Sequence, residues 1–236
     1  MSTALNYQSG FGNEYASVAI PGALPQGRNS PQKVAHGLFA ELMSGTAFTA
    51  PRAANQRTWM YRRQPSAVAG GYEPLAHATL KTSAREGLVG PPNPMGWHPT
   101  PIPEAAMDFV QGLHTVAVNG DADAQVGLAV HLYLVNRSMV DSAFVNADGE
   151  MLIVPQTGAL TITTELGVLE VAPGEIALLP RGMAFRVAVD GPSRGYICEN
   201  YGAAFRLPEL GPIGSNGLAN RRDFLAPVAA FEEPGN

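Results

Sequence analysis

Glycine and proline interrupt this chain too often for long helices to form. Its 236 residues include 26 glycines and 20 prolines. Inside a helix each glycine costs about 1 kcal/mol, and each proline about 3 kcal/mol, relative to alanine. This density of helix breakers argues against a helical bundle. It favours many short strands joined by turns, with few short helices.

The region from 107 to 206 contains a series of short segments typical of strands, each bounded by Gly, Pro or Asp. They are GLAVHLYLV, EMLIVPQ, GALTITTE, GVLEVAP, EIALLP, AFRVAV and GYICENY. In the first of them, the even-numbered residues 128 to 134 share one face and the odd-numbered residues 129 to 135 share the other. The stretch NADG at 146–149 predicts a turn, with Asp148-Gly149 as a hairpin signal. Strands at this spacing predict an all-β sandwich or barrel.

The rest of the chain lacks a sustained period, so we divide the sequence into four parts. Residues 1–65 form an extended wrapping arm, 66–106 a proline-rich connector, 107–206 the barrel, and 207–236 an irregular tail. The arm carries aromatic residues that we expect to be buried against its own barrel or a neighbouring subunit. They are Tyr7, Phe11, Tyr15, Phe39, Phe48, Trp59 and Tyr61.

Charge and composition exclude several classes of function. The net charge of -5 argues against nucleic-acid binding. The sequence has no run of 18 apolar residues, and its first ten residues lack the order of a signal peptide, so we expect no membrane association. Cys198 is the only cysteine, which excludes an intrachain disulfide. We therefore expect a soluble cytoplasmic protein.

One segment, GEIALLPRGMAF at 174–185, follows the spacing of a known metal-binding motif. Gly174, Pro180 and Gly182 resemble the second signature motif of the cupin β-barrels. That motif ends in a metal-binding histidine, and Phe185 occupies its position here. Glycines such as Gly182 suit turns that require positive φ, which gives the motif a structural reason to persist without a metal.

The first cupin motif is placed by Gly158, which takes the position of its final glycine. The motif's glutamate then falls on Met151, and its two histidines fall at or near Phe144 and Asn146. Phenylalanine and methionine do not bind hard Fe(II) or Zn(II) usefully, and asparagine is a weak donor. We predict a degenerate, metal-free, jelly-roll barrel with a packed apolar interior. On this basis no catalytic, cofactor-binding or metal-binding residue is assigned.

The remaining candidates are weaker. His114 and His131 bracket a predicted strand and provide an alternative metal-site hypothesis, although a hydrogen-bonded structural histidine is far more common. Cys198 is interpreted as a small buried hydrophobe. Glu199 and Tyr201 alternate with it and face the other way, which leaves a general-acid role open.

Long stretches of irregular sequence that resemble a known protein family are also informative, because such matches seldom arise by chance. In the arm and tail these are YQSGFGNEYAS at 7–17, GALPQGRNSPQ at 22–32, GLFAELMSGTAFTAPR at 37–52, RTWMYRRQPS at 57–66 and LPELGPIGSNGLANRRDFLAPVAAFE at 207–232. In the barrel they are DFVQGLHT at 108–115, GLAVHLYLVNRSM at 127–139, DGEMLIVPQTG at 149–158 and RGYICENYG at 194–202. Over nearly its whole length the chain resembles the homogentisate 1,2-dioxygenase family.

The resemblance implies an enzyme that opens homogentisate with O2 to give maleylacetoacetate, in tyrosine and phenylalanine catabolism. In the family, two histidines and a glutamate of the C-terminal half hold a non-haem Fe(II) and leave positions open for substrate and oxygen. No position of this sequence matches those ligands. The resemblance therefore implies that the iron is bound by a C-terminal half that this chain lacks, and that no cofactor binds here. It also implies a homo-oligomer, a trimer or hexamer.

Two functional hypotheses follow. The first is the structural N-terminal domain of a homogentisate 1,2-dioxygenase, inactive as an isolated chain. The alternative is a stand-alone, non-catalytic, cupin-like binding or scaffold protein. The coding sequence after Asn236 distinguishes them, since a continuing frame with His and Glu ligands supports the enzyme. Apolar surface left where a second barrel docks predicts self-association of the isolated chain.

Overall fold

The computed structural model describes residues 5–9, 17–23, 34–55, 57–68, 77–86, 92–96, 98–206 and 221–230. The chain divides into two compact units. The barrel unit comprises residues 76–165 and 169–206, and the second unit comprises 1–75, 166–168 and 207–236. The four-part division made from the sequence stays a prediction.

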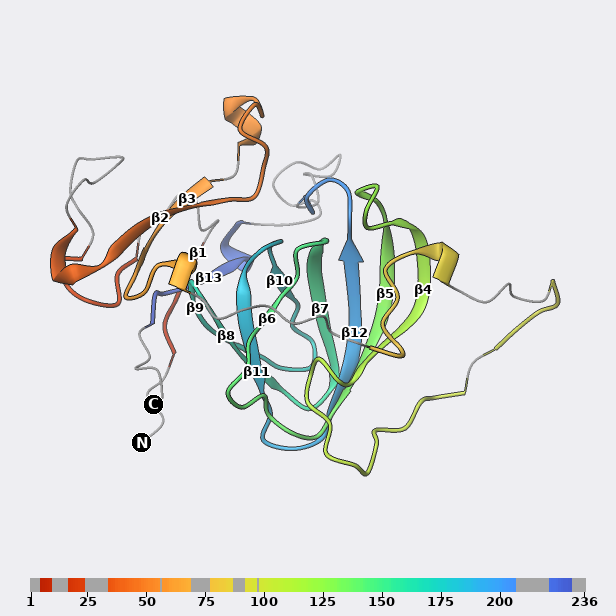
Figure 1. Cartoon of the computed structure of the whole chain (residues 1–236). Coiled ribbons are helices and arrows are strands. Elements are labelled where there is room, and N and C mark those ends of the chain that lie inside the picture. The colour runs from red at the N-terminus through yellow and green to blue at the C-terminus, as the bar shows by residue number, and fades with distance from the viewer. Residues whose placement is uncertain are drawn as a thin grey trace. The chain divides into compact units, whose positions relative to one another are not determined.

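The barrel unit consists of nine strands and one 3-10 helix (Figure 1). The strands are β4 (Leu113–Asp121), β5 (Val126–Val135), β6 (Phe144–Val145), β7 (Glu150–Thr157), β8 (Leu160–Thr164), β9 (Gly167–Val171), β10 (Ala177–Leu179), β11 (Ala184–Ala188) and β12 (Ser193–Asn200), of which β9 begins in the second unit. The helix is η4 (Ala84–Glu86). Among the described residues, no helix has the length and apolarity that a membrane span requires.

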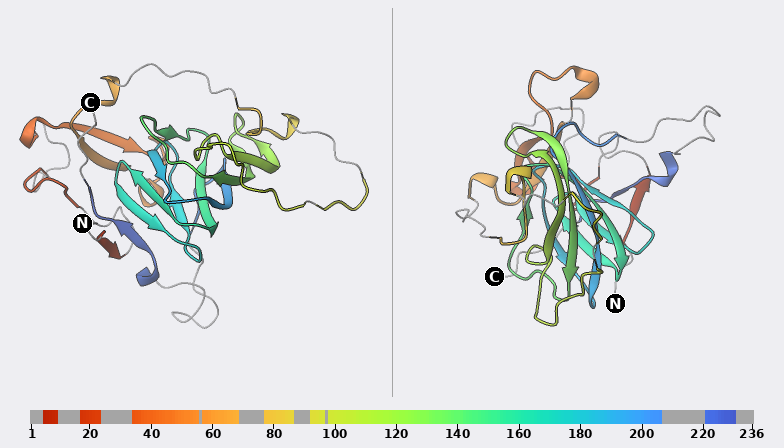
Figure 2. Two further views of the ribbon diagram at one scale, coloured as in Figure 1. Left: turned by 90° about the horizontal axis from the view of Figure 1, so that it is seen from below. Right: turned by 90° about the vertical axis from the view of Figure 1, so that its right-hand side faces the viewer.

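The barrel strands form two sheets with the connectivity of a jelly roll. One sheet has the order β10-β7-β12-β5-β4, and the other has the order β6-β11-β8-β9. Let the eight strands from β5 to β12 be numbered in chain order. In the first sheet, the first, eighth, third and sixth of them then lie side by side in that order. The second sheet pairs the second, seventh, fourth and fifth, which is the double Greek-key pattern. Both views in Figure 2 show the strands of the two sheets packed close to one another. The prediction of an all-β, cupin-like barrel is confirmed.

The two sheets enclose one hydrophobic core. The five-stranded sheet contributes Tyr133, Met151, Ile153 and Ile197, and the four-stranded sheet contributes residues such as Phe185. Aromatic rings connect the layers, since the Phe109 ring lies 5.5 Å from that of Tyr133 in β5 and 6.0 Å from that of Phe185 in β11, centroid to centroid. Burial of these side chains is the main stabilising term for the unit, at about 1.5–3 kcal/mol for each large apolar side chain.

Turn glycines explain why the cupin spacing is retained. Gly174 and Gly182 have φ values of 98° and 79°. These values lie in the left-handed region, where any residue with a Cβ is strained. The backbone of the turns therefore requires these glycines whether or not a metal is bound, and the prediction of positive φ at Gly182 is confirmed.

The stretch at 146–149 is a bend, and the hairpin prediction is wrong. β6 pairs with β11, while β7 pairs with β10 and β12, so the bend leads from one sheet into the other. The Asn146 side chain supplies the hydrogen bonds that a hairpin would obtain from strand pairing. Its Oδ1 accepts from the backbone N–H groups of Asp148 and Gly149 at 2.9 and 3.1 Å.

The second unit contains two small antiparallel sheets where the sequence predicted only irregular chain. Its strands are β1 (Tyr7–Ser9), β2 (Phe39–Ser44), β3 (Arg57–Arg62) and β13 (Leu225–Pro227), and its 3-10 helices are η1 (Ala35–Gly37), η2 (Arg52–Ala54), η3 (Ser66–Val68) and η5 (Arg221–Asp223). β1 pairs with β13, and β2 pairs with β3. Apolar and polar residues do not alternate along β2 and β3, and the partner of β1 lies at the far end of the chain.

Side chains of the arm explain how β2 and β3 are held. Glu41 forms an ion pair with Arg62 at 3.0 Å and accepts two hydrogen bonds from Ser66. These contacts hold the pKa of Glu41 below its ordinary value, chiefly through the bond from the Ser66 backbone N–H.

Three of the arm aromatics are not buried against this chain's own barrel. Phe39 is 47% exposed, Phe48 83% and Trp59 36%, and their burial against a neighbouring subunit stays a prediction. The guanidinium of Arg57 lies 5.5 Å from the centroid of the Phe48 ring, a cation–π contact that an exposed ring can keep. Phe11 and Tyr15 lie outside the described residues.

Candidate functional site

The four positions that would carry metal ligands in a cupin lie inside the barrel unit. Phe185 in β11 pairs in register with Phe144 in β6, and their rings meet edge to face at 5.6 Å. Met151 and Phe185 are each 2% exposed and belong to the same core cluster. Asn146 is buried at the entrance to β7. Three of these four positions therefore carry side chains packed against other apolar groups.

These residues do not fit an Fe(II) site. Phenyl rings offer no lone pair, and a thioether is a soft ligand that suits Cu(I) rather than Fe(II). The one donor group, the amide of Asn146, is engaged on both its oxygen and its nitrogen. No group of three or more His, Cys, Asp or Glu side chains that could hold a metal ion occurs among the described residues.

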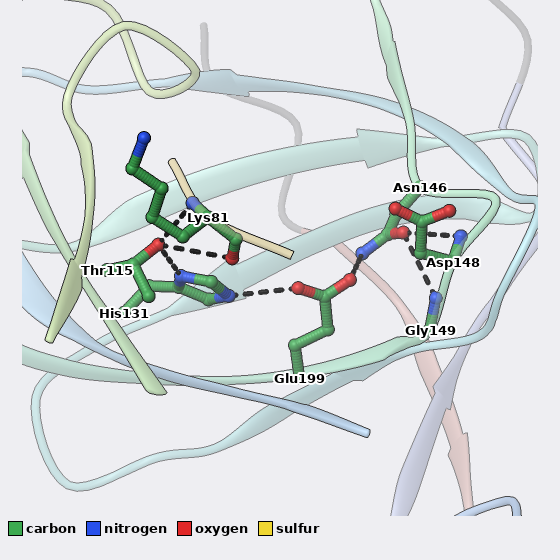
Figure 3. Close-up of polar contacts among 7 residues, drawn as sticks. All are labelled: Lys81, Thr115, His131, Asn146, Asp148, Gly149 and Glu199. Atoms are coloured by element: carbon green, nitrogen blue, oxygen red, sulfur yellow. Dashed lines mark hydrogen bonds and ion pairs between the residues drawn. The ribbon is translucent and has the colours of Figure 1, made fainter. Parts of the chain in front are cut away.

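The most buried polar pair of the barrel is His131 and Glu199 (Figure 3). His131 is 0% exposed and Glu199 is 4% exposed. The pairing of β5 with β12 places Ile197 opposite His131 and Ala129 opposite Glu199, so the two side chains are diagonal neighbours on the inner face. The imidazole Nε2 donates to Glu199 Oε2 at 2.9 Å.

The second carboxylate oxygen of Glu199 is satisfied by Asn146. Asn146 Nδ2 donates to Glu199 Oε1 at 2.6 Å. Together with the bonds from the following backbone to Asn146 Oδ1, this contact ties the bend before β7 to the middle of the barrel (Figure 3). A buried carboxylate is tolerated when its oxygens are hydrogen-bonded.

The other nitrogen of His131 faces Thr115 of β4. Thr115 Oγ1 lies 2.9 Å from His131 Nδ1, and the same oxygen accepts from the backbone N–H of Lys81 at 2.8 Å. With the proton of His131 on Nε2, every contact has one donor and one acceptor. The hydrogen bonds run from Lys81 through Thr115, His131 and Glu199 to Asn146, and we call this series the buried relay.

The order Thr115–His131–Glu199 resembles a nucleophile, a base and an acid, but the geometry favours a structural role. The hydroxyl of Thr115 is already committed to a backbone N–H and to His131. His131 has no exposed surface at which a substrate carbonyl group would approach. The relay instead joins the segment around Lys81 to three strands and a bend, which fixes their relative positions in a low-dielectric interior.

Asp148 lies at the outer end of the relay. Partial desolvation of its carboxyl group raises the pKa of Asp148, and the neighbouring carboxylates of Glu199 and Asp123 raise this pKa further, while Arg181 lowers it. Arg181 is itself held by the backbone, because its Nη2 donates to the carbonyl oxygen of Tyr201 at 2.6 Å.

The hypothesis of a metal held by both His114 and His131 is wrong. His131 pairs in register with Thr115, whereas His114 pairs with Leu132, so the two imidazoles leave opposite faces of the five-stranded sheet. The structure places His131 in the hydrogen-bonded role that the sequence analysis considered far more common.

His77 and Cys198 have ordinary surroundings. His77 Nε2 lies 2.7 Å from the carbonyl oxygen of Val110, and its Nδ1 accepts from the backbone N–H of Leu80 at 3.1 Å. Cys198 is half-buried, on the face opposite Glu199 and Tyr201, so the predicted alternation is confirmed and its full burial is not.

The sequence missed the relay because its members are far apart along the chain. His131 and Glu199 are 68 residues apart, and Asn146 and Glu199 are 53 residues apart. The only local signal was the alternation in β5, which placed His131 on one face with Ala129, Tyr133 and Val135. That signal does not say which face lies inside.

A comparison with protein families agrees with this structure. The family described as "Homogentisate 1,2-dioxygenase N-terminal" matches residues 6–236. The chain belongs to this family. The match runs through both units and leaves only the first five residues outside.

Solved structures resemble this chain only distantly. A cupin superfamily protein from Desulfitobacterium hafniense is 15% identical, with 45% of this chain and 93% of that chain covered and a TM-score of 0.33. A cupin-2 domain protein from Shewanella frigidimarina is 19% identical, with 31% and 70% covered and a TM-score of 0.28. The Cnp3 cupin domain from Schizosaccharomyces pombe is 13% identical, with 40% and 69% covered and a TM-score of 0.32.

Proposed function

We propose that this chain is the metal-free N-terminal part of an Fe(II)-dependent homogentisate 1,2-dioxygenase. The family match over residues 6–236 supports this assignment. In the proposed enzyme a C-terminal half holds the iron and receives homogentisate and O2, and the ring is cleaved to maleylacetoacetate in tyrosine and phenylalanine catabolism. A homo-oligomer, trimeric or hexameric, and a cytoplasmic location belong to the same proposal.

The proposed role of the barrel is to act as a scaffold. One observation carries this role. Met151 and Phe185 stand where a cupin is expected to have metal ligands, but both pack in the core and offer no hard donor. The polar groups nearby do not compensate, because His131, Glu199 and Asn146 satisfy one another. A barrel filled in this way is rigid and gives a catalytic half a fixed surface on which to assemble.

The isolated chain provides the first test. It is loaded with Fe(II) under anaerobic conditions, desalted and analysed for iron, and O2 uptake is then followed with homogentisate. We expect far less than one iron per chain and no O2 uptake above the rate with free Fe(II). One iron per chain, together with ring cleavage that a chelator abolishes, would contradict the proposal.

The variant His131→Gln serves as a matched control in the same assay. Glutamine keeps a donor for Glu199 but removes the imidazole, the strongest metal donor among the relay residues described. If the chain does bind iron, loss of that iron in His131→Gln places the ion in the relay. Retention of the iron places it elsewhere, which contradicts the metal-free assignment of the chain and leaves the relay itself metal-free.

A further inference from the structure

A pocket on the outer face of the five-stranded sheet has the composition of an anion site. Its volume is about 390 Å³, within the range of small-molecule sites. It crosses four neighbouring strands, because Gln156, Arg194, Leu132 and His114 come from β7, β12, β5 and β4 in turn. Figure 1 shows these strands side by side.

Side chains that are positive or neutral provide the polar part of the pocket. They are Arg194, His114, His98, Gln156, Thr100 and Thr115, and no aspartate or glutamate among the described residues lines the pocket. A pocket without acids is notable in a chain whose formal net charge is -5. An anion that enters it meets a permanent guanidinium charge and side-chain N–H donors, with no carboxylate in the lining to repel it.

The guanidinium of Arg194 is held in place and still has donors to offer. Its Nη1 donates to the carbonyl oxygen of Thr100 at 2.9 Å, which fixes the segment 98–100 as one wall of the pocket. That bond uses one of the five N–H groups of the side chain. Within the described part of the chain, no other contact of the Arg194 side chain is seen, so a carboxylate can occupy the remaining fork.

The apolar part of the lining consists of Leu132, Pro99 and Val116. Val116 is 37% exposed, a fraction that a small ligand with an apolar body would reduce. An inorganic anion would leave these three side chains in water, whereas an aromatic or aliphatic carboxylate would cover them.

We infer that this pocket binds a small organic carboxylate with an apolar body, through Arg194, His114 and Gln156. The inference is independent of the proposed dioxygenase function, because Arg194, His114 and Gln156 belong to this chain and lie outside the buried relay, of which only Thr115 borders the pocket. Its failure would leave the scaffold proposal unchanged.

The test uses benzoate as the probe on the full chain, followed by the amide NMR shifts of residues 98–100, 114–116 and 194. Benzamide, of the same shape without the charge, and inorganic phosphate are titrated in parallel. We expect saturable benzoate binding localised to these residues, with benzamide and phosphate each at least about tenfold weaker. Phosphate binding as tight as benzoate binding, or no saturable benzoate shift, would overturn the inference.

Three variants separate the site from general charge effects. Arg194→Gln is expected to weaken benzoate binding about tenfold or more, through loss of charge-assisted hydrogen bonds. Gln156→Glu changes an exposed residue with little risk to folding, and should weaken benzoate binding severalfold while benzamide is unaffected. Arg85→Gln removes the same charge at an exposed position outside the pocket. Equal weakening in Arg85→Gln and Arg194→Gln would refute the site.

Discussion

The interior of the barrel contains two neighbouring regions with different kinds of side chain. Around Phe185 the positions carry phenyl rings and a thioether, which pack by contact alone. Around His131 they carry an imidazole, a carboxylate and an amide, and each is hydrogen-bonded. The regions meet where Met151 of β7 pairs in register with Glu199 of β12.

The two regions should differ in how strongly a substitution destabilises the folded chain. An apolar cluster loses contact area when a side chain is shortened, and its neighbours can close part of the gap. A buried polar pair cannot close a gap in this way, because the remaining partner keeps its need for a donor or acceptor. The buried relay should therefore be the more sensitive region to single substitutions and the more tolerant one to paired substitutions.

The largest effect is expected from removing one member of the buried pair. His131→Leu leaves the Glu199 carboxylate with only the Asn146 amide, which should reduce the free energy of unfolding by about 3–5 kcal/mol. Urea unfolding followed by circular dichroism measures this loss. The double variant His131→Leu/Glu199→Leu should be more stable than the single variant, because no unpaired charge stays buried. A double variant less stable than His131→Leu would contradict the expected difference between the two regions.

A smaller loss is expected in the apolar region. Phe185→Ala removes ring contacts with Phe144 at 5.6 Å and Phe109 at 6.0 Å, and should reduce the free energy of unfolding by about 3 kcal/mol. The matched control is Leu178→Ala, because Leu178 is 43% exposed on the outer face. The control should lose less than about 1 kcal/mol, since little buried area is removed. Similar losses in both variants would show that Phe185 is not a core residue.

The smallest effect concerns pH and the outer end of the relay. The pKa of Asp148 is raised above 3.8 in the folded chain, so its contribution to stability is complete below pH 3.8 and is lost as the pH rises through the folded pKa. The variant Asp148→Asn has no carboxyl group at this position, so it does not lose this stability as the pH rises. Because the residue is exposed, we expect a gain of only about 0.5 kcal/mol near neutral pH. Urea unfolding at several pH values measures it, and a gain that persists below pH 3.8 would contradict the assignment.

Much of the fold could be predicted from the sequence because its signals are local. Glycines and prolines mark the ends of the strands, and the positive φ values of Gly174 and Gly182 follow from turns that only glycine adopts without strain. The assignment of Phe144, Met151 and Phe185 to cupin ligand positions also came from the sequence, and it stays a prediction. β2 and β3 were missed because apolar and polar residues do not alternate along FAELMS and RTWMYR.

The sequence by itself determined that the chain is built of short strands joined by turns. Only the tertiary structure decided which face of each strand lies inside. In β5 the face with Leu128 and Val130 points outward, with Leu128 41% exposed, and the face with Ala129 and His131 is buried. Alternation defines two faces without ranking them. The pairing of β5 with β12 buried His131 beside Glu199, and that contact joins residues too distant in the chain for any local pattern to connect.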